Sequence, residues 1–124
     1  MNNTSTYNIG KQGEDLATEF LEKQGYRILE RNFVHNKKEI DIIAQDKNTI
    51  VFVEVKERAT DIFGEPFEAV NLRKQKRIIN VADSYIRKHN IDLESRFDII
   101  SIVKSPNEET KILHIKDAFT PIMF

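Results

Sequence analysis

Three residues in the first half of the chain have the types and spacing of a metal-dependent hydrolytic site. Asp41 lies in the segment EIDIIAQ, and Glu54 and Lys56 form a Glu-x-Lys element that ends the segment IVFVEVK. Carboxylate oxygens are the hard ligands that Mg²⁺ and Mn²⁺ prefer. A divalent cation held by Asp41 and Glu54 would activate water and polarise a phosphodiester, and Lys56 would orient that water or stabilise developing charge.

The segments that carry these residues, Glu39–Gln45 and Ile50–Lys56, are predicted to form an antiparallel hairpin. Both are rich in β-branched residues, and the Asp and Asn of the intervening Asp46–Thr49 favour a turn. Side chains alternate along a strand, so the second strand should present on one face Ile50, Phe52, Glu54 and Lys56. In the first strand, the same alternation puts Ile40 and Ile42 on one face and Asp41 on the other.

The turn also predicts the register of the hairpin. A turn that is symmetric about its two middle residues places Asp41 opposite Glu54, and Glu39 opposite Lys56. Like charges directly opposite one another destabilise a sheet. A cation bound by Asp41 and Glu54 together would remove that repulsion.

The same three residues also have ordinary structural interpretations. Charged residues make up 31% of the chain, so an Asp followed by Glu-x-Lys can arise by chance. Glu54 and Lys56 then remain open as surface charges at a strand end, and Asp41 as a polar residue close to a turn. The pattern favours a site because all three fall on neighbouring strands.

The remaining predicted elements determine what can surround the hairpin. Apolar residues at helical spacing predict a helix over Asn8–Gln24, ended by Gly25. The other expected elements are a strand at Tyr26–Phe33, a helix at Glu68–His89, and strands at Arg96–Val103 and Lys111–Ile115, joined by a turn at Lys104–Thr110. The order is α-β-β-β-α-β-β, which is typical of an α/β fold.

Composition narrows the class of protein. At 124 residues with 40% hydrophobic residues, we expect one globular domain spanning residues 1–124, with no linker or repeat. The chain has no cysteine, so a metal must be held by oxygen or histidine ligands. A signal sequence and an apolar run of about 20 residues are both missing, which predicts a cytoplasmic protein without a membrane segment. With a formal net charge of -1, any surface for nucleic acid must be local.

A cluster of basic residues is the candidate for such a surface. Arg73, Lys74, Lys76 and Arg77 lie in the second predicted helix, and Arg58 follows the Glu-x-Lys element. Lys74 and Arg77 are three residues apart and therefore neighbours on one helix face. We predict phosphate contacts for Arg58, Lys74 and Arg77, and favour a solvated helix face for Arg73 and Lys76.

Two further features have weaker interpretations. The segment Glu57–Pro66 holds Phe63 next to the predicted site, and an aromatic there would stack on an unpaired base, although packing against the second helix is the favoured alternative. The histidines, His35, His89 and His114, have no spacing typical of metal ligands, so they are assigned no role.

Several segments together resemble a known family, the YraN-like uncharacterised proteins. They are IGKQGEDLATEFLEKQGYRILERNF, EIDIIAQDKNTIVFVEVKER, FGEPFEAVNLRKQKR and RFDIISI, which span nearly the whole chain. That family is similar in fold to the PD-(D/E)xK nucleases, which include restriction endonucleases and archaeal Holliday-junction resolvases. The resemblance implies a restriction endonuclease-like αβββαβ core, with a mixed central sheet flanked by helices.

The resemblance also assigns residues. Asp41 matches the motif aspartate, and Glu54 and Lys56 match the (D/E)xK element. Glu14, in the segment GKQGE, matches a glutamate that assists the metal site in resolvase-like members. Its ordinary interpretation is a solvated carboxylate in the first turn of a helix, where the helix dipole favours negative charge. Lys38 departs from the pattern, because the family usually has glycine before Glu-Ile-Asp.

Two functions from different classes follow. The resemblance implies an endonuclease dependent on Mg²⁺ or Mn²⁺ that hydrolyses DNA phosphodiester bonds, with branched or structured DNA suggested by the resolvases and a homodimer by their paired cuts. The metal would be bound by Asp41, Glu54 and Glu14. The alternative is a nucleic-acid-binding or protein-interaction module that keeps the fold without turnover.

Overall fold

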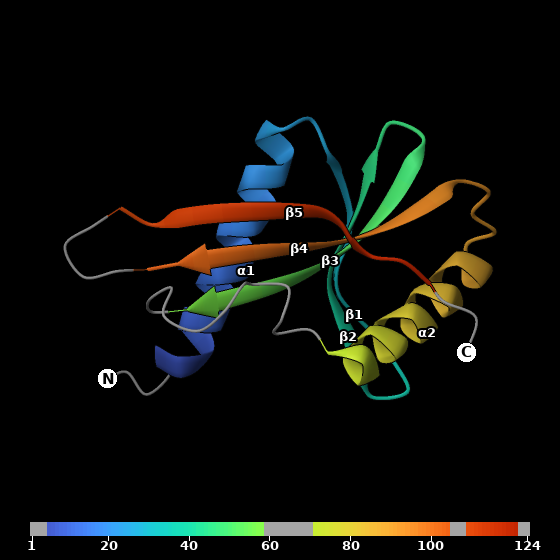
Figure 1. Ribbon diagram of the computed structural model, residues 1–124, viewed down its shortest axis with the longest axis horizontal. Coiled ribbons are helices and arrows are strands. Elements are labelled where there is room, and N and C mark those ends of the chain that lie inside the picture. Colours follow the sequence, from blue (N-terminus) through green and yellow to red (C-terminus); the bar gives the residue numbers. More distant parts are fainter. Residues whose placement is uncertain (1–4, 59–70, 105–108, 122–124) are drawn as a thin grey trace.

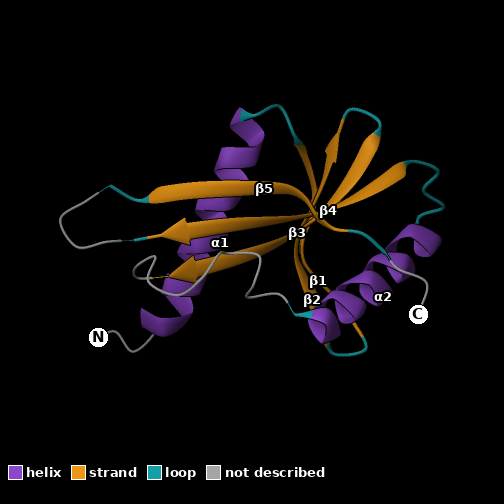
Figure 2. Cartoon of the chain, in the orientation of Figure 1, coloured by secondary structure: helices purple, strands orange, loops and turns teal. Residues whose placement is uncertain are grey.

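The computed structural model describes residues 5–58, 71–104 and 109–121, with backbone alone for residues 5–11 and for Arg58. Within these ranges, a five-stranded mixed sheet lies between two helices (Figure 1, Figure 2). The elements in chain order are α1 (Ser5–Lys23), β1 (Arg27–His35), β2 (Lys38–Asp46), β3 (Thr49–Arg58), α2 (Leu72–Lys88), β4 (Glu94–Val103) and β5 (Lys111–Phe119). The predicted order of elements and the α/β class are confirmed, and the architecture is consistent with a restriction endonuclease-like core.

The sheet follows the order of the chain. Its strands are arranged β1-β2-β3-β4-β5, antiparallel except for the parallel pair β3 and β4, which α2 connects. A parallel pair needs such a crossover connection. In Figure 1, α1 passes behind β3, β4 and β5, and α2 lies beside β1 and β2.

Each helix covers its own apolar core. Under α1 lie Ala17 and Leu21 of the helix with Ile42, Ala44, Val51, Val53, Ile100 and Ile102 of the sheet. Under α2 lie Ile78, Val81, Ala82 and Tyr85 with Ile40, Ile43, Ile50, Phe52, Phe97 and Ile99. The sheet therefore buries both faces, which explains the long β-branched runs in its central strands.

The helix ends have recognisable stop and start signals. After α1, Gly25 has φ +94°, its N–H donates to the carbonyl of Glu22, and the N–H of Tyr26 donates to the carbonyl of Leu21. These two bonds form a Schellman motif, which confirms Gly25 as the stop. Before α2, Asn71 is the N-cap, its side chain accepting from the N–H of Lys74. The predicted start of this helix at Glu68 is therefore too early, because Asn71 is extended.

The predicted hairpin register is confirmed where the β2–β3 ladder runs. Its pairs extend from Asp46 opposite Thr49 to Ile42 opposite Val53. Next, the N–H of Val55 donates to Asp41 Oδ2 at 2.8 Å. The expected pairings of Asp41 with Glu54 and of Glu39 with Lys56 both lie beyond this ladder.

Candidate active site

The strand β2 departs from the predicted alternation at Asp41. Ile42 packs under α1 with Val53, whereas Ile40 packs under α2. The prediction that Ile40 and Ile42 share one face was therefore wrong. The side chain of Asp41 lies where β2 changes faces.

The neighbouring strand β1 reverses at the facing position. Arg31 pairs with Ile42 and reaches Asp15 of α1, its Nη2 lying 2.8 Å from Oδ1, whereas Phe33 pairs with Ile40 and packs in the α2 core. Asn32 lies between them with φ +54°, in the left-handed region. Because both strands reverse together, this part of the sheet can receive side chains from α1 and from α2.

Asn32 is the residue through which α1 is tied to this position. Its Nδ2 donates to Glu14 Oε1 at 2.9 Å and to Glu39 Oε2 at 2.7 Å. Gly13 precedes Glu14 and is buried, and a Cβ there would collide with the carboxylate of Glu57 in β3. A Cβ at position 13 would displace the flexible end of the Glu57 side chain, so Gly13 marks a close contact between α1 and that side chain.

Three carboxylates converge here. Glu14, Glu39 and Asp41 each offer an oxygen atom, and these atoms lie within 4.8 Å of one another. An all-oxygen donor set of this kind fits Mg²⁺ or Mn²⁺ better than a softer metal. Glu39 was missed as a candidate ligand, because the predicted alternation pointed it at Lys56. The signal available was its place two residues before Asp41 in the Glu-Ile-Asp element.

Glu54 belongs to the same site but has a cation of its own. It is 7% exposed, on the α2 face of β3, and its Oε2 lies 2.7 Å from Lys74 Nζ and 4.0 Å from Lys56 Nζ. Glu54 is absent from the convergent group of Glu14, Glu39 and Asp41. The structure thus brings Asp41, Glu54, Lys56 and Glu14 to one place and adds Lys74 to it.

Burial and neighbouring charges shift the pKa values of three groups at the site. Burial and the charge of Glu54 raise the pKa of Asp41 to about 8, and Glu14 and Glu39 push it the same way, against the hydrogen bond from Val55. Burial and the neighbouring charge of Lys74 lower the pKa of Lys56. For Lys74, burial is outweighed by the hydrogen bond and charge of Glu54, so its pKa is raised.

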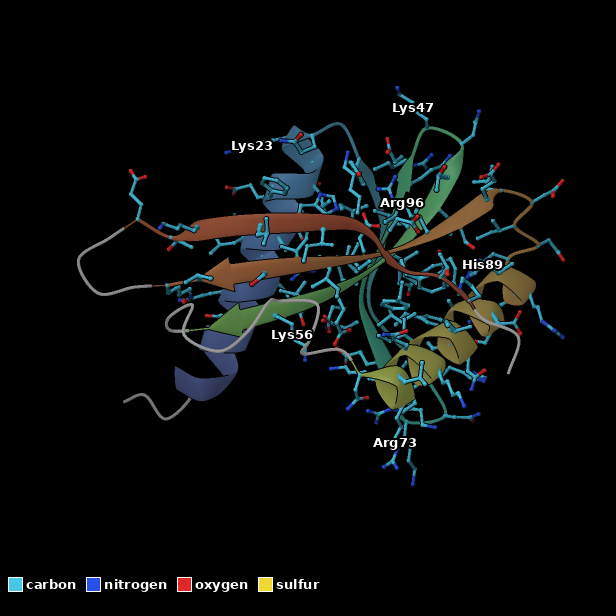
Figure 3. The ribbon with its side chains drawn as sticks, in the orientation of Figure 1. Lys23, Lys47, Lys56, Arg73, His89 and Arg96 are labelled. Carbon is cyan, nitrogen blue, oxygen red and sulfur yellow. The ribbon has the colours of Figure 1, made fainter. Side chains whose placement is uncertain are left out.

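A pocket of about 310 Å³ opens beside Glu39, Asp41 and Glu54. It is lined by Lys37, Lys38, Glu39, Asp41, Glu54, Lys74, Arg77 and Ile78. Two of the three predicted phosphate contacts, Lys74 and Arg77, are therefore at the pocket. The third, the Arg58 side chain, and the segment around Phe63 lie outside the described residues. In Figure 3, Lys56 lies near the middle of the molecule, and Arg73 lies at the start of α2.

No helix in the described part of the chain is long and apolar enough to cross a membrane.

Comparison with known proteins places this arrangement in a family. The model of the uncharacterised protein family UPF0102 matches residues 13–102, which include every residue of the candidate site. A UPF0102 protein of Flavobacterium psychrophilum is 48% identical over 111 residues, covering 90% of this chain and 92% of the relative.

Two further relatives come from other bacteria. A UPF0102 protein of Bacteroides thetaiotaomicron is 44% identical over 116 residues, covering 94% of this chain and 95% of the relative. One of Persephonella marina is 49% identical over 111 residues, covering 89% of this chain and 91% of the relative. The expected family, described from the sequence as YraN-like, is thus confirmed, and the chain belongs to the uncharacterised protein family UPF0102.

Proposed function

We propose that this protein is a metal-dependent nuclease that hydrolyses phosphodiester bonds of DNA. The observation that carries the proposal is the gathering of Glu14, Glu39 and Asp41 beside Glu54, at a pocket with a basic rim. Several partly buried carboxylates repel one another, and a divalent cation is the ligand that relieves this repulsion. The sheet positions them there by reversing both β1 and β2.

The convergent carboxylates are the candidate ligands of the cation. Asp41, Glu14 and Glu39 would hold it. Glu54, which forms an ion pair with Lys74, is a further candidate ligand. When bound, a divalent cation supplies Lewis-acid polarisation of the scissile phosphate and lowers the pKa of water. The carboxylate of Asp41 must be ionised to bind it, so the raised pKa makes proton and cation competitors at this oxygen.

The two lysines have separate tasks. Lys56 and Lys74 both approach Glu54, at 4.0 and 2.7 Å. Lys74 neutralises Glu54 and stands at the rim, where a phosphate oxygen would meet its ammonium group. Lys56 donates to the attacking water or to the developing charge on the phosphate. Its lowered pKa suits proton exchange with that water.

The direct test is cleavage of labelled DNA. The purified protein is incubated with linear duplex, single-stranded, flapped and four-way-junction DNA, in magnesium, in manganese, or in EDTA. Metal-dependent cleavage supports the proposal, and the preferred substrate identifies the DNA structure recognised. Binding without cleavage of any of these substrates would contradict it and favour a second candidate.

That second candidate is a binding module without turnover. It is favoured by the Lys74 contact, because a 2.7 Å ion pair neutralises Glu54 without any metal. The two candidate functions differ in whether a divalent cation stabilises the folded chain.

The metal-free protein should lose stability as pH rises from about 4 to about 8. In this range folded Asp41, with a pKa of about 8, keeps a proton that the unfolded chain has lost, because the ordinary value is 3.8. The unfolded state therefore binds fewer protons, and the free energy of unfolding falls with rising pH until the folded group also ionises. Asp41→Asn should flatten this part of the profile, as measured by thermal unfolding in EDTA.

Millimolar Mn²⁺ should reverse the trend. A cation bound only by the folded state raises the melting temperature, and it competes with fewer protons at about pH 8 than at about pH 6. We expect an increase of several degrees near pH 8 and a smaller one near pH 6. Equal melting temperatures with and without metal at both pH values would count against a metal site and for the binding module.

Asn32 should matter for metal affinity without being a ligand. Asn32→Gly keeps the positive φ but removes the amide that holds both Glu14 and Glu39. Loss of such an orienting hydrogen bond typically costs about 10–100-fold in metal affinity. Calorimetric titration with Mn²⁺ measures it, and Asn90→Gly is the matched control, since Asn90 has φ +50° at the end of α2. Equal affinities for the two variants would remove Asn32 from the site.

A further inference from the structure

The pocket has a basic rim that comes from two separate elements. Lys37 and Lys38 belong to the β1–β2 turn and the start of β2, and Lys74 and Arg77 belong to the first two turns of α2. Glu39, Asp41 and Glu54 of the candidate active site line the same pocket and are called its floor. In the proposed function, Lys74 on the α2 side of this rim meets a phosphate oxygen, and the two lysines of the turn have no role.

The turn side of the rim is held in a tight conformation. Asn36 and Lys37 both have positive φ, +54° and +66°, and they connect paired His35 and Lys38. Two central residues with positive φ define a type I′ turn, in which glycine is favoured at the second position. Lys37 occupies that position at a conformational cost. The turn therefore carries two adjacent positive charges, Lys37 and Lys38, in a tight two-residue connection.

Lys38 is compatible with this geometry. It lies in β2 opposite His35, outside the set of described residues with positive φ. A glycine is therefore not required by the backbone at this position, and the lysine adds a charge at the pocket without straining the strand.

The basic residues on the α2 side of the rim lower the stability of the helix. The first turn of α2 contains no acidic residue, and Arg73, Lys74, Lys76 and Arg77 follow its N-cap. Positive charge at a helix N-terminus opposes the helix dipole, which favours anions there. Basic residues at the N-terminus of α2 and a lysine with positive φ in the β1–β2 turn both cost the folded protein stability. Residues kept in spite of such a cost are typical of a functional site, which here would be one that binds an anion.

The arrangement of charges in the pocket indicates which kind of anion it would bind. The carboxyl groups of Glu39, Asp41 and Glu54 offer a phosphate no positive charge unless a cation bridges them, whereas the four basic residues that line the same pocket attract negative charge. A nucleic-acid strand has regularly repeated phosphates, so one phosphate can lie at the floor while its neighbours meet the two sides of the rim.

We propose that the β1–β2 turn is a second phosphate-binding element, in which Lys37 and Lys38 hold the DNA backbone at the same pocket as Lys74 and Arg77 of α2. This inference rests on the proposed function and extends it from the reacting phosphate to the flanking ones. It predicts that the turn contributes to affinity through charge, without sequence preference.

The test compares two pairs of turn and surface lysines. All proteins carry Asp41→Asn to prevent cleavage, and fluorescence anisotropy measures binding to a labelled duplex in magnesium at salt concentrations between about 50 and 200 mM. The rim variant is Lys37→Asn with Lys38→Gln. The matched control is Lys47→Asn with Lys23→Gln, because Lys47 also has positive φ in a hairpin turn and lies at the opposite end of the molecule from Arg73 (Figure 3).

The rim variant should bind about fivefold to tenfold more weakly at the lowest salt, and its plot of log affinity against log salt should be shallower by about two. The control variant should match its parent in both. Unchanged melting temperatures of both variants show that the turns stay folded.

The outcomes separate the two proposals. If the rim and control variants bind alike while the wild-type chain cleaves DNA, the turn has no phosphate-binding task and the proposed function stands. If the wild-type chain neither binds nor cleaves DNA, both fail together. A loss confined to the rim variant supports the second phosphate-binding element.

Discussion

Asp41→Asn is expected to reduce metal-dependent DNA cleavage on the order of 1,000-fold, because the cation supplies several kcal/mol of stabilisation to the transition state and loses its central ligand. Asp41 is the carboxylate that faces Glu54 while converging with Glu14 and Glu39. Initial rates on the preferred substrate of the panel, at saturating Mg²⁺, measure the effect. The folded chain should not be weakened, since the substitution removes a repelled carboxylate.

Two matched variants make this result specific. Glu54→Gln should lose a comparable amount, whereas Asp46→Asn changes a carboxylate at the far end of β2 and should keep the parental rate. If Asp41→Asn and Asp46→Asn cleave equally well, the activity belongs to a contaminant or to another site. Full activity of Asp41→Asn alone would likewise exclude Asp41 as a ligand.

Arg96→Met is expected to be the most destabilising single change among the polar residues of the described structure. Asp98 is fully buried, and Arg96 donates to both of its oxygens, each at 2.9 Å, while also donating to the hydroxyl of Tyr26. His114 Nε2 lies 2.7 Å from the same carboxylate. Removing one partner of such a buried pair costs about 3–5 kcal/mol, because the other charge stays buried.

Urea unfolding at about neutral pH measures this change, and the chain provides its own control. Arg87 pairs with Asp83 at 2.9 Å on the exposed side of α2, so Arg87→Met should cost less than about 0.5 kcal/mol. A similar small loss for Arg96→Met would mean that the Tyr26, Asp98 and His114 group is satisfied without the guanidinium.

The fold could be predicted from sequence as far as regular patterns extend. Gly25 ended α1, and the turn at Lys47 and Asn48 set the β2–β3 register, because local turn chemistry and period-two alternation specify these features directly. The face shared by Phe52, Glu54 and Lys56 followed from the same alternation.

The parts of the site that were missed lie where the pattern breaks. Alternation assigns Ile40 and Ile42 to one face, which they do not share, because β1 and β2 reverse together at Asn32 and Asp41. A left-handed asparagine inside a strand leaves little trace in a single sequence. The sequence identified Lys74 as a basic helix residue but did not identify its ion pair with Glu54. That pair forms because the crossover after β3 brings α2 back to the sheet, and such a long-range contact cannot be inferred from residue spacing alone.

The paired reversal has a consequence for how the molecule completes folding. Glu14 belongs to α1, Lys74 belongs to α2, and Asp41 lies in the sheet between the two helices. A chain in which either helix has not packed on the sheet therefore lacks part of the candidate site. Cation affinity therefore reports on the docking of both layers at once. A divalent ion that binds only the finished arrangement selects against half-assembled chains, and its removal should first loosen the helices rather than the hairpin between them.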